Sequence, residues 1–165
     1  MSITKDRAWR FELPVSALAT VPHERPKGLS LNPTGNIAMA EDSRAVHQSI
    51  ILLLATRPGE RLMRPDYGCN LHRLVFAPND AGTAGLAIHY VGAALRRWEP
   101  RIAIQRLDAG ADLFATGDET VLDIILDYRI RRTGQQEQLT LAYGLDDARL
   151  MANPGGNETR QGDAR

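Results

Sequence analysis

The sequence predicts an α+β fold, a two-layer domain with two main helices packed on a small, mostly antiparallel sheet, plus an extended N-terminal arm. Two stretches, 43–56 and 80–98, carry apolar residues at helical spacing. A third stretch, 120–131, alternates apolar and polar residues as a half-buried strand does. At 165 residues the chain can bury a core in one domain. Helices that precede a run of strands fit a helical layer covering a sheet.

The arm is assigned to residues 1–31 and the domain to residues 32–145. Proline fixes the backbone and removes a hydrogen-bond donor, so it disfavours long helices. Four prolines fall within the first 40 residues: Pro14, Pro22, Pro26 and Pro33. We therefore expect an arm that wraps over the domain or over a neighbouring protein.

The first helix is predicted over residues 43–56. Ser43 is a suitable N-cap, and Pro58-Gly59 ends the helix. At helical spacing, one face of this segment gathers its apolar residues, which are Val46, Ile50, Leu53 and Leu54.

The segment that follows, TRPGERLMRPDYGCN at 56–70, combines turn-forming residues with three arginines. We expect a short strand at 60–64, which contains Arg61 and Arg64, and then a turn at 65–70 that contains Asp66. Residues 71–76 are a short apolar piece of undetermined type. Because guanidinium groups pair bidentately with carboxylates, this connector is predicted to be a rigid, shaped surface that binds another protein.

The second helix is predicted over residues 80–98. Asn79 or Asp80 can cap it, and Pro100 ends it. Its buried face is expected to hold the apolar residues that recur at helical spacing, which are Ala84, Ile88, Val91, Leu95 and Trp98.

Three strands are predicted after this helix, at 101–108, 120–131 and 138–144. In the second, the apolar residues from Leu122 to Ile130 face a core, while Asp123, Asp127, Arg129 and Arg131 face water or a partner. The turn at 133–136 joins the last two strands as an antiparallel hairpin. Residues 146–165 contain few apolar residues and are predicted to form a polar, flexible tail.

Catalytic chemistry was weighed at one pair of carboxylates. A glycoside hydrolase needs two such groups about 5–9 Å apart. Glu60 and Asp66 are close in sequence, but arginines beside them stabilise their ionised forms, which disfavours a general acid. No catalytic residue is therefore predicted, and the protein is not expected to be an enzyme.

No cofactor, metal or nucleic acid is expected to bind. Cys69 and His72 form an isolated half-site, and a small buried cysteine is favoured over a nucleophile. The net charge is zero, and no basic patch contains interleaved aromatic residues. The longest apolar run, at 49–55, is far shorter than the roughly 20 residues of a membrane span. Without a signal peptide, we expect synthesis in the cytoplasm and no membrane insertion.

Three motifs together resemble one family: the helix stop RPGER at 57–61, the turn RPDYG at 64–68, and WEPR at 98–101. The chain resembles the baseplate wedge family of contractile phage tails over about residues 32–143. That family includes the phage baseplate assembly protein W, the type VI secretion subunit TssE and the matching subunit of extracellular contractile injection systems. The resemblance therefore does not distinguish a phage tail from a type VI secretion system or an extracellular injection system.

The resemblance implies a structural subunit of the inner baseplate, which joins the wedge core to the first sheath ring and initiates sheath assembly by strand addition. Its partners would be wedge proteins and the sheath protein, with inner tube or hub proteins as further candidates, in six copies per baseplate. The family's assembly motif falls on Glu99, Pro100 and Arg101. A salt bridge that only stabilises the end of the helix is the alternative role for this motif.

Two other functions were considered. Some family members carry a lysozyme label, and a peptidoglycan hydrolase would require a cleft with two carboxylates. An adaptor that binds a regulator in the cytoplasm would be a stable monomer of the same fold.

Overall fold

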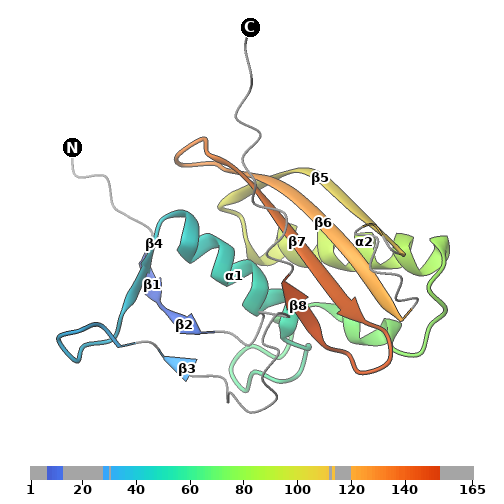
Figure 1. Ribbon diagram of the computed structural model, residues 1–165, viewed down its shortest axis with the longest axis horizontal. Coiled ribbons are helices and arrows are strands. Elements are labelled where there is room, and N and C mark those ends of the chain that lie inside the picture. The colour runs from blue at the N-terminus through green and yellow to red at the C-terminus, as the bar shows by residue number, and fades with distance from the viewer. Residues whose placement is uncertain (1–6, 13–27, 30, 112, 114–119, 153–165) are drawn as a thin grey trace, which may run out of the picture.

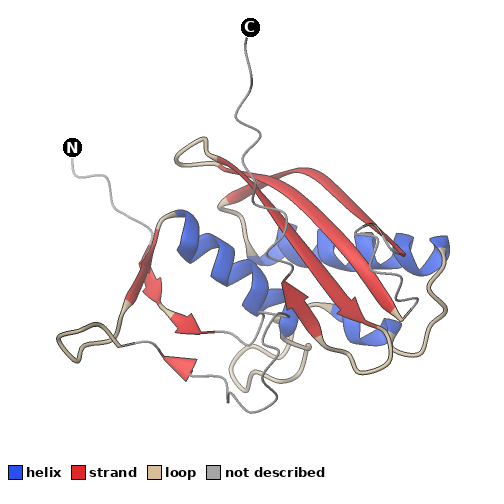
Figure 2. Ribbon diagram, viewed as in Figure 1, coloured by secondary structure: helices blue, strands red, loops and turns tan. Residues whose placement is uncertain are grey.

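The computed structural model describes residues 7–12, 28–29, 31–111, 113 and 120–152 (Figure 1). It confirms the α+β class: helices and a mostly antiparallel sheet share one hydrophobic core. Figure 2 shows the long second helix behind the sheet and the first helix beside it. The helices are α1 (Ser43–Ala55), the 3-10 helix η1 (Asn70–Leu74) and α2 (Ala81–Trp98).

The main sheet is antiparallel and has the order β5-β6-β7-β8. Its strands are β5 (Ile102–Ala111), β6 (Val121–Ile130), β7 (Gln136–Gly144) and β8 (Leu150–Ala152). The three predicted strands correspond to β5, β6 and β7. Strand β5 lies at one edge, and its register shifts between Ile104 and Arg106.

The start of α1 differs from the prediction. Ser43 is not the N-cap but the first helical residue, and Asp42 occupies the cap position without a side-chain hydrogen bond to the helix. The Asp42 carboxylate instead forms an ion pair with Arg132, from the turn after β6. The helix ends as expected before Pro58, with the Thr56 N–H donating to the carbonyl oxygens of Leu52 and Leu53.

The start of α2 confirms one of the two predicted caps. Asp80 Oδ1 accepts a hydrogen bond from the Thr83 N–H at 2.8 Å. This bond stabilises the carboxylate and lowers the pKa of Asp80. On the face of α2 that packs against the core, Val91 and Leu95 are fully buried.

Strand β6 has the predicted inward face, but one polar residue is misplaced. The alternating residues from Leu122 to Ile130 are buried as expected, and Arg129 is exposed. Asp123, however, was predicted to face water and is 1% exposed. It lies opposite Gly110 of β5, and the Leu113 side chain covers the sheet surface at that glycine. The Leu113 side chain therefore shields part of the outer face.

Strand β8 was not predicted, and it begins inside the segment assigned to the tail. Its residues pair with β7 from Leu141↔Ala152 to Tyr143↔Leu150. A turn leads into it, in which Asp147 Oδ1 accepts the Arg149 N–H at 3.0 Å. Three residues are too few to show an alternating pattern. The rest of the predicted tail, 153–165, lies outside the described residues.

The described part of the arm forms β-ribbons that lead into α1. Strand β1 (Arg7–Trp9) pairs with β4 (Met39–Glu41), and β2 (Phe11–Glu12) pairs with β3 (Gly28–Leu29). The Gln48 side chain of α1 donates to the Trp9 carbonyl oxygen at 2.7 Å. Residues 7–10 therefore lie against the chain's own domain, while residues 1–6 and 13–27 lie outside the described residues.

Candidate functional site

The connector between α1 and η1 is a closed loop rather than a strand. Gly59 N–H donates to the Pro65 carbonyl oxygen at 2.6 Å, and Cys69 N–H donates to that of Thr56 at 2.9 Å. These two bonds draw the ends of the loop together. Glu60 closes the first turn, because its Oε2 accepts the Arg57 N–H at 2.9 Å.

The predicted strand at 60–64 is therefore wrong. Residues 61–64 make a turn in which the Arg64 N–H donates to the Arg61 carbonyl oxygen at 3.1 Å. Proline and glycine on both sides of this segment favour a turn over an extended strand. The turn places Leu62 and Met63 at the tip of the loop, where they are 99% and 93% exposed.

Gly68 lets the loop close against α1. Its φ is +133°, a conformation that residues with a side chain rarely adopt. A Cβ at this position would lie 2.4 Å from the Thr56 carbonyl oxygen. The backbones of the two loop ends can therefore approach each other only because residue 68 has no side chain.

Stacked aromatic and arginine side chains fasten the connector to the end of α2. The Arg61 guanidinium lies 4.0 Å from the centre of the Tyr67 ring, and the Tyr67 and Trp98 rings are 5.3 Å apart. Arg97 lies over Trp98 and forms an ion pair with Asp66. Two of the three site residues predicted in the connector, Arg61 and Asp66, thus have contacts within the chain.

The predicted motif at 99–101 forms a tight corner between α2 and β5. Glu99 is 5% exposed, and Arg101 binds it bidentately, with Nε to Oε1 at 2.5 Å and the terminal nitrogen to Oε2 at 2.7 Å. Arg101 also donates to the Ser49 hydroxyl of α1 at 2.9 Å. Pro100 is exposed between them. The corner therefore ties both helices to the sheet and leaves Pro100 exposed at its surface.

A groove of about 520 Å³ adjoins this corner. It lies between the C-terminal half of α2 and the first residues of β5. Apolar side chains of Leu95, Ile102 and Ile104 line it, with Arg96 and Arg131 as its cations. An extended peptide beside β5 would place apolar or acidic side chains in this groove.

The outer side of β5 has backbone groups directed away from the sheet. The Arg131 N–H donates to the Arg101 carbonyl oxygen at 2.8 Å, so residues 101 and 103 form the bonded pairs with β6. Their neighbours Ile102 and Ile104 therefore direct their backbone groups to the free edge. Both groups of Ile102 already have partners within the chain: its N–H donates to the Glu99 carbonyl oxygen at 3.3 Å, and its carbonyl oxygen accepts from Arg131 Nε at 3.0 Å.

The two carboxylates of the connector, Glu60 and Asp66, each have a structural contact. Glu60 and Asp66 are both exposed on the connector. One holds the backbone of its own loop, and the other is paired with Arg97.

Cys69 is a buried structural residue. It is 2% exposed, and this burial raises the pKa of its thiol from 9.0 to about 11. A protonated thiol is a poor nucleophile and a poor metal ligand. Within the described ranges, no group of three or more potential ligands gathers around a metal position.

The raised pKa of Cys69 predicts a loss of stability at alkaline pH. Below about pH 9 the thiol is protonated in both the folded and the unfolded chain, so the stabilisation that comes from its raised pKa is fully present there. Between about pH 9 and 11 the unfolded chain loses this proton and the folded chain keeps it, so the free energy of unfolding falls by about 2 kcal/mol. Urea unfolding at a series of pH values measures this. In Cys69→Ala the free energy of unfolding should fall by about 2 kcal/mol less over the same pH range. If it falls equally with pH in the wild type and in Cys69→Ala, the alkaline loss of stability does not come from this thiol.

The six predicted site residues form two adjacent groups. Glu99, Pro100 and Arg101 make the corner, and Arg61, Arg64 and Asp66 belong to the connector. The contact between Tyr67 and Trp98 links the groups, since Trp98 directly precedes Glu99.

Four further residues take part that the sequence patterns do not indicate. Ser49 and Arg97 are distant in sequence from the residues that they bind, so only the folded chain reveals them. Leu62 and Met63 are not among the predicted site residues, because a predicted strand at 60–64 gives no sign of an exposed tip. The sequence does contain a signal for an exposed tip. Both residues lie between two arginines, in a segment that proline and glycine bound.

Comparisons with known proteins show that the connector and the corner both lie within the part of the chain that matches one family. The model of the family described as baseplate wedge protein gp25 matches residues 40–135. A Geobacter sulfurreducens structure described as a candidate tail lysozyme is 36% identical, with a TM-score of 0.58, and the match covers 68% of this chain and 100% of that one. No match was found among curated proteins.

Two baseplate structures are also similar. A chain of the anti-feeding prophage baseplate is 20% identical with a TM-score of 0.61, over 77% of this chain and 86% of that one. A chain of the post-contraction pyocin R2 baseplate is 27% identical with a TM-score of 0.48, over 62% of this chain and 97% of that one. In the part of the chain that the structure describes, no helix is long and apolar enough to cross a membrane.

Proposed function

This chain belongs to the baseplate wedge protein gp25 family and is a structural baseplate component, and we propose that it joins the wedge core to the first sheath ring. The corner at Glu99, Pro100 and Arg101 would bind the wedge proteins. The outer edge of β5 would receive a strand of the sheath protein and so initiate sheath assembly. Inner tube or hub proteins are further candidate partners.

The free edge of β5 carries this proposal. Among the described residues, this ten-residue strand has a partner strand on one side only, whereas β7 is covered in part by β8. An added strand could bond to the backbone of Ile104 and place alternate side chains in the adjoining groove. A groove beside a free edge is the arrangement expected for strand addition with side-chain selectivity.

The remaining features of the proposal follow from the family. Six copies per baseplate would place one copy in each wedge. The protein would be made in the cytoplasm and assembled into the baseplate of a phage tail or a contractile injection particle.

The two alternative functions have less support. A hydrolase is disfavoured because Glu60 and Asp66 are exposed and engaged by Arg57 and Arg97. The word lysozyme describes the Geobacter relative, and no catalytic arrangement among the described residues accompanies it here. A cytoplasmic adaptor would leave the β5 edge and its groove without a use.

Blocking the β5 edge tests strand addition. In Ile104→Pro the N–H directed to the free edge is removed, while the bonds between β5 and β6 stay intact. Affinity purification of the tagged full-length variant from its source is expected to recover wedge proteins but at least tenfold less sheath protein than the wild type, as mass spectrometry would quantify.

A matched variant at the other edge is Leu150→Pro. Gly144 N–H donates to the Arg149 carbonyl oxygen, so Leu150 directs its own N–H away from β7. Both Ile104 and Leu150 are partly buried against the core, so their packing losses are comparable. Loss of sheath protein in Leu150→Pro alone would move the docking edge to β8. Absence of all baseplate proteins from the wild-type purification would refute the proposed function itself.

A further inference from the structure

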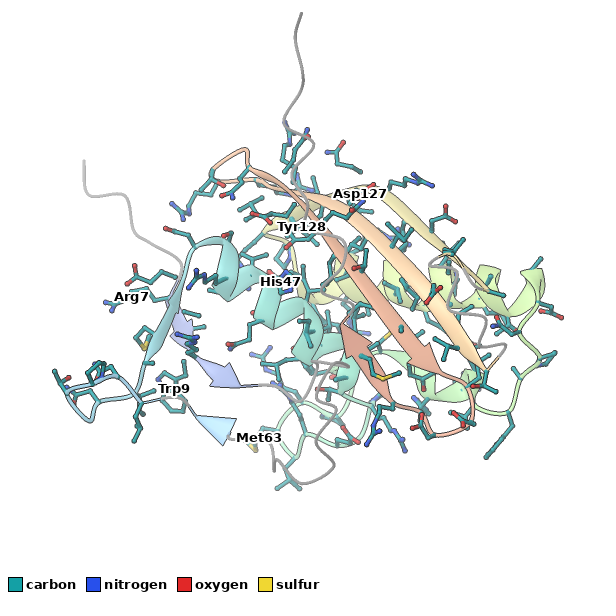
Figure 3. All side chains as sticks on the ribbon, viewed as in Figure 1. Arg7, Trp9, His47, Met63, Asp127 and Tyr128 are labelled. Carbon is teal, nitrogen blue, oxygen red and sulfur yellow. The ribbon has the colours of Figure 1, made fainter. Side chains whose placement is uncertain are left out.

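The tip of the connector presents two large apolar side chains to water. Leu62 is 99% exposed and Met63 is 93% exposed, more than any other large hydrophobic residue among those described. Figure 3 shows Met63 at the periphery of the molecule, far from the strand that carries Asp127 and Tyr128. Exposed apolar residues of this size are unfavourable in water unless a partner covers them.

The tip is held in place rather than loosely exposed. Four backbone hydrogen bonds of 2.6–3.2 Å cross the loop from Arg57 to Tyr67. Below the tip, the ring of Tyr67 is fixed between Arg61 and Trp98. A loop that is already ordered loses little conformational entropy when it binds, so more of its contact energy appears as affinity.

Two cations flank the tip. Arg61 and Arg64 are exposed directly beside Leu62 and Met63, whereas Arg57 lies at the base of the loop near the end of α1, and the two carboxylates of the loop are occupied. Glu60 accepts the Arg57 N–H, and Asp66 is neutralised by Arg97. The rim of the tip therefore has a net positive charge and suits a partner surface with carboxylates.

We propose that the connector tip is a preformed plug that inserts Leu62 and Met63 into an apolar pocket of another baseplate protein, a pocket rimmed by Asp or Glu side chains. This inference rests on the proposed function and names a contact distinct from the β5 edge and the corner. Arginine forks match carboxylates geometrically, and two large apolar side chains that become buried in a pocket on binding contribute affinity through the hydrophobic effect. A lipid surface suits this tip less well, because stable membrane binding requires a larger apolar face.

Binding of purified proteins tests the plug. The full-length chain would be titrated with each separately purified wedge and sheath protein of its own particle. With Leu62→Ser/Met63→Ser, affinity for one of them is expected to fall by about 30-fold or more. Leu86→Ser is the matched control: Leu86 is 48% exposed on α2, away from the connector, and its affinity should equal that of the wild type.

Charge variants test the rim. Arg64→Glu is expected to weaken binding to the same protein at least tenfold, while Arg64→Lys keeps the charge and loses only the fork. An equal affinity of wild type, the double serine variant and Arg64→Glu for every baseplate protein would overturn the plug. Binding of the wild type to vesicles of phosphatidylethanolamine and phosphatidylglycerol, lost in the double serine variant, would replace the protein partner with a membrane.

The plug and the proposed function fail in distinguishable ways. If the wild type binds no baseplate protein at all, both are refuted. If it binds them and the double serine variant binds equally well, the baseplate function stands and the plug alone is refuted.

Discussion

Chains in which Glu99 and Arg101 are both replaced by alanine are expected to fold but to form at least tenfold fewer sheathed particles. The double replacement removes two charges that neutralise each other, so no unpaired charge is left inside the corner. Arg101→Ala alone leaves the Glu99 carboxylate, which is 5% exposed, without its bidentate partner and should cost about 3 kcal/mol, more than the double variant. Thermal unfolding compares the stabilities, and electron microscopy counts the particles.

The matched control is Arg7→Ala/Glu41→Ala. This pair is also a carboxylate bound by an arginine, but it lies away from the corner and the connector, and its side chains are 57% and 42% exposed, so its loss should change stability by less than about 1 kcal/mol. Normal particle numbers from a folded Glu99→Ala/Arg101→Ala chain would leave the corner with a purely structural role. That outcome would favour the alternative in which the salt bridge only stabilises the end of α2.

Gly68→Ala is expected to destabilise the chain by more than about 3 kcal/mol. The added methyl group would lie 2.4 Å from the Thr56 carbonyl oxygen, and φ of +133° strains any residue with a side chain. Relief requires the end of α1 and the start of η1 to move apart, which would break the bond from the Cys69 N–H to Thr56. Chemical denaturation of the purified variant measures the loss.

Gly59→Ala separates strain from collision in the same loop. Gly59 also has a positive φ, of +98°, but nothing lies within 4 Å of an added Cβ. It should therefore cost only about 1–2 kcal/mol, the cost of the backbone conformation alone. Equal losses at the two glycines would show that the close approach at Gly68 does not matter.

The regular elements could be predicted because their burial follows a simple period. Helix α2 and strand β6 each repeat apolar residues often enough for a pattern to appear, and α2 begins at a residue with a strong capping side chain. The prediction of Ser43 as the N-cap was wrong because the chain enters α1 through Asp42 at φ +48°, a geometry that no local propensity indicates.

The failures share a physical cause, which is contact between residues distant in sequence. Asp123 is buried because Leu113 covers the neighbouring glycine, and β8 exists because β7 offers it an edge. The sequence motifs indicated the corner and the connector, but not the link between them. That link needs Tyr67 and Trp98 to meet, 31 positions apart.

The internal pairing of Glu99 with Arg101 has a consequence for how the particle would respond to ionic strength. A corner whose two charges already satisfy each other exerts little field on an approaching protein, so a contact there should be almost insensitive to salt. The arginine-rimmed tip should behave in the opposite way, because its charges are exposed and unbalanced within the loop. One small subunit would then hold its neighbours by one salt-resistant joint and one salt-sensitive joint.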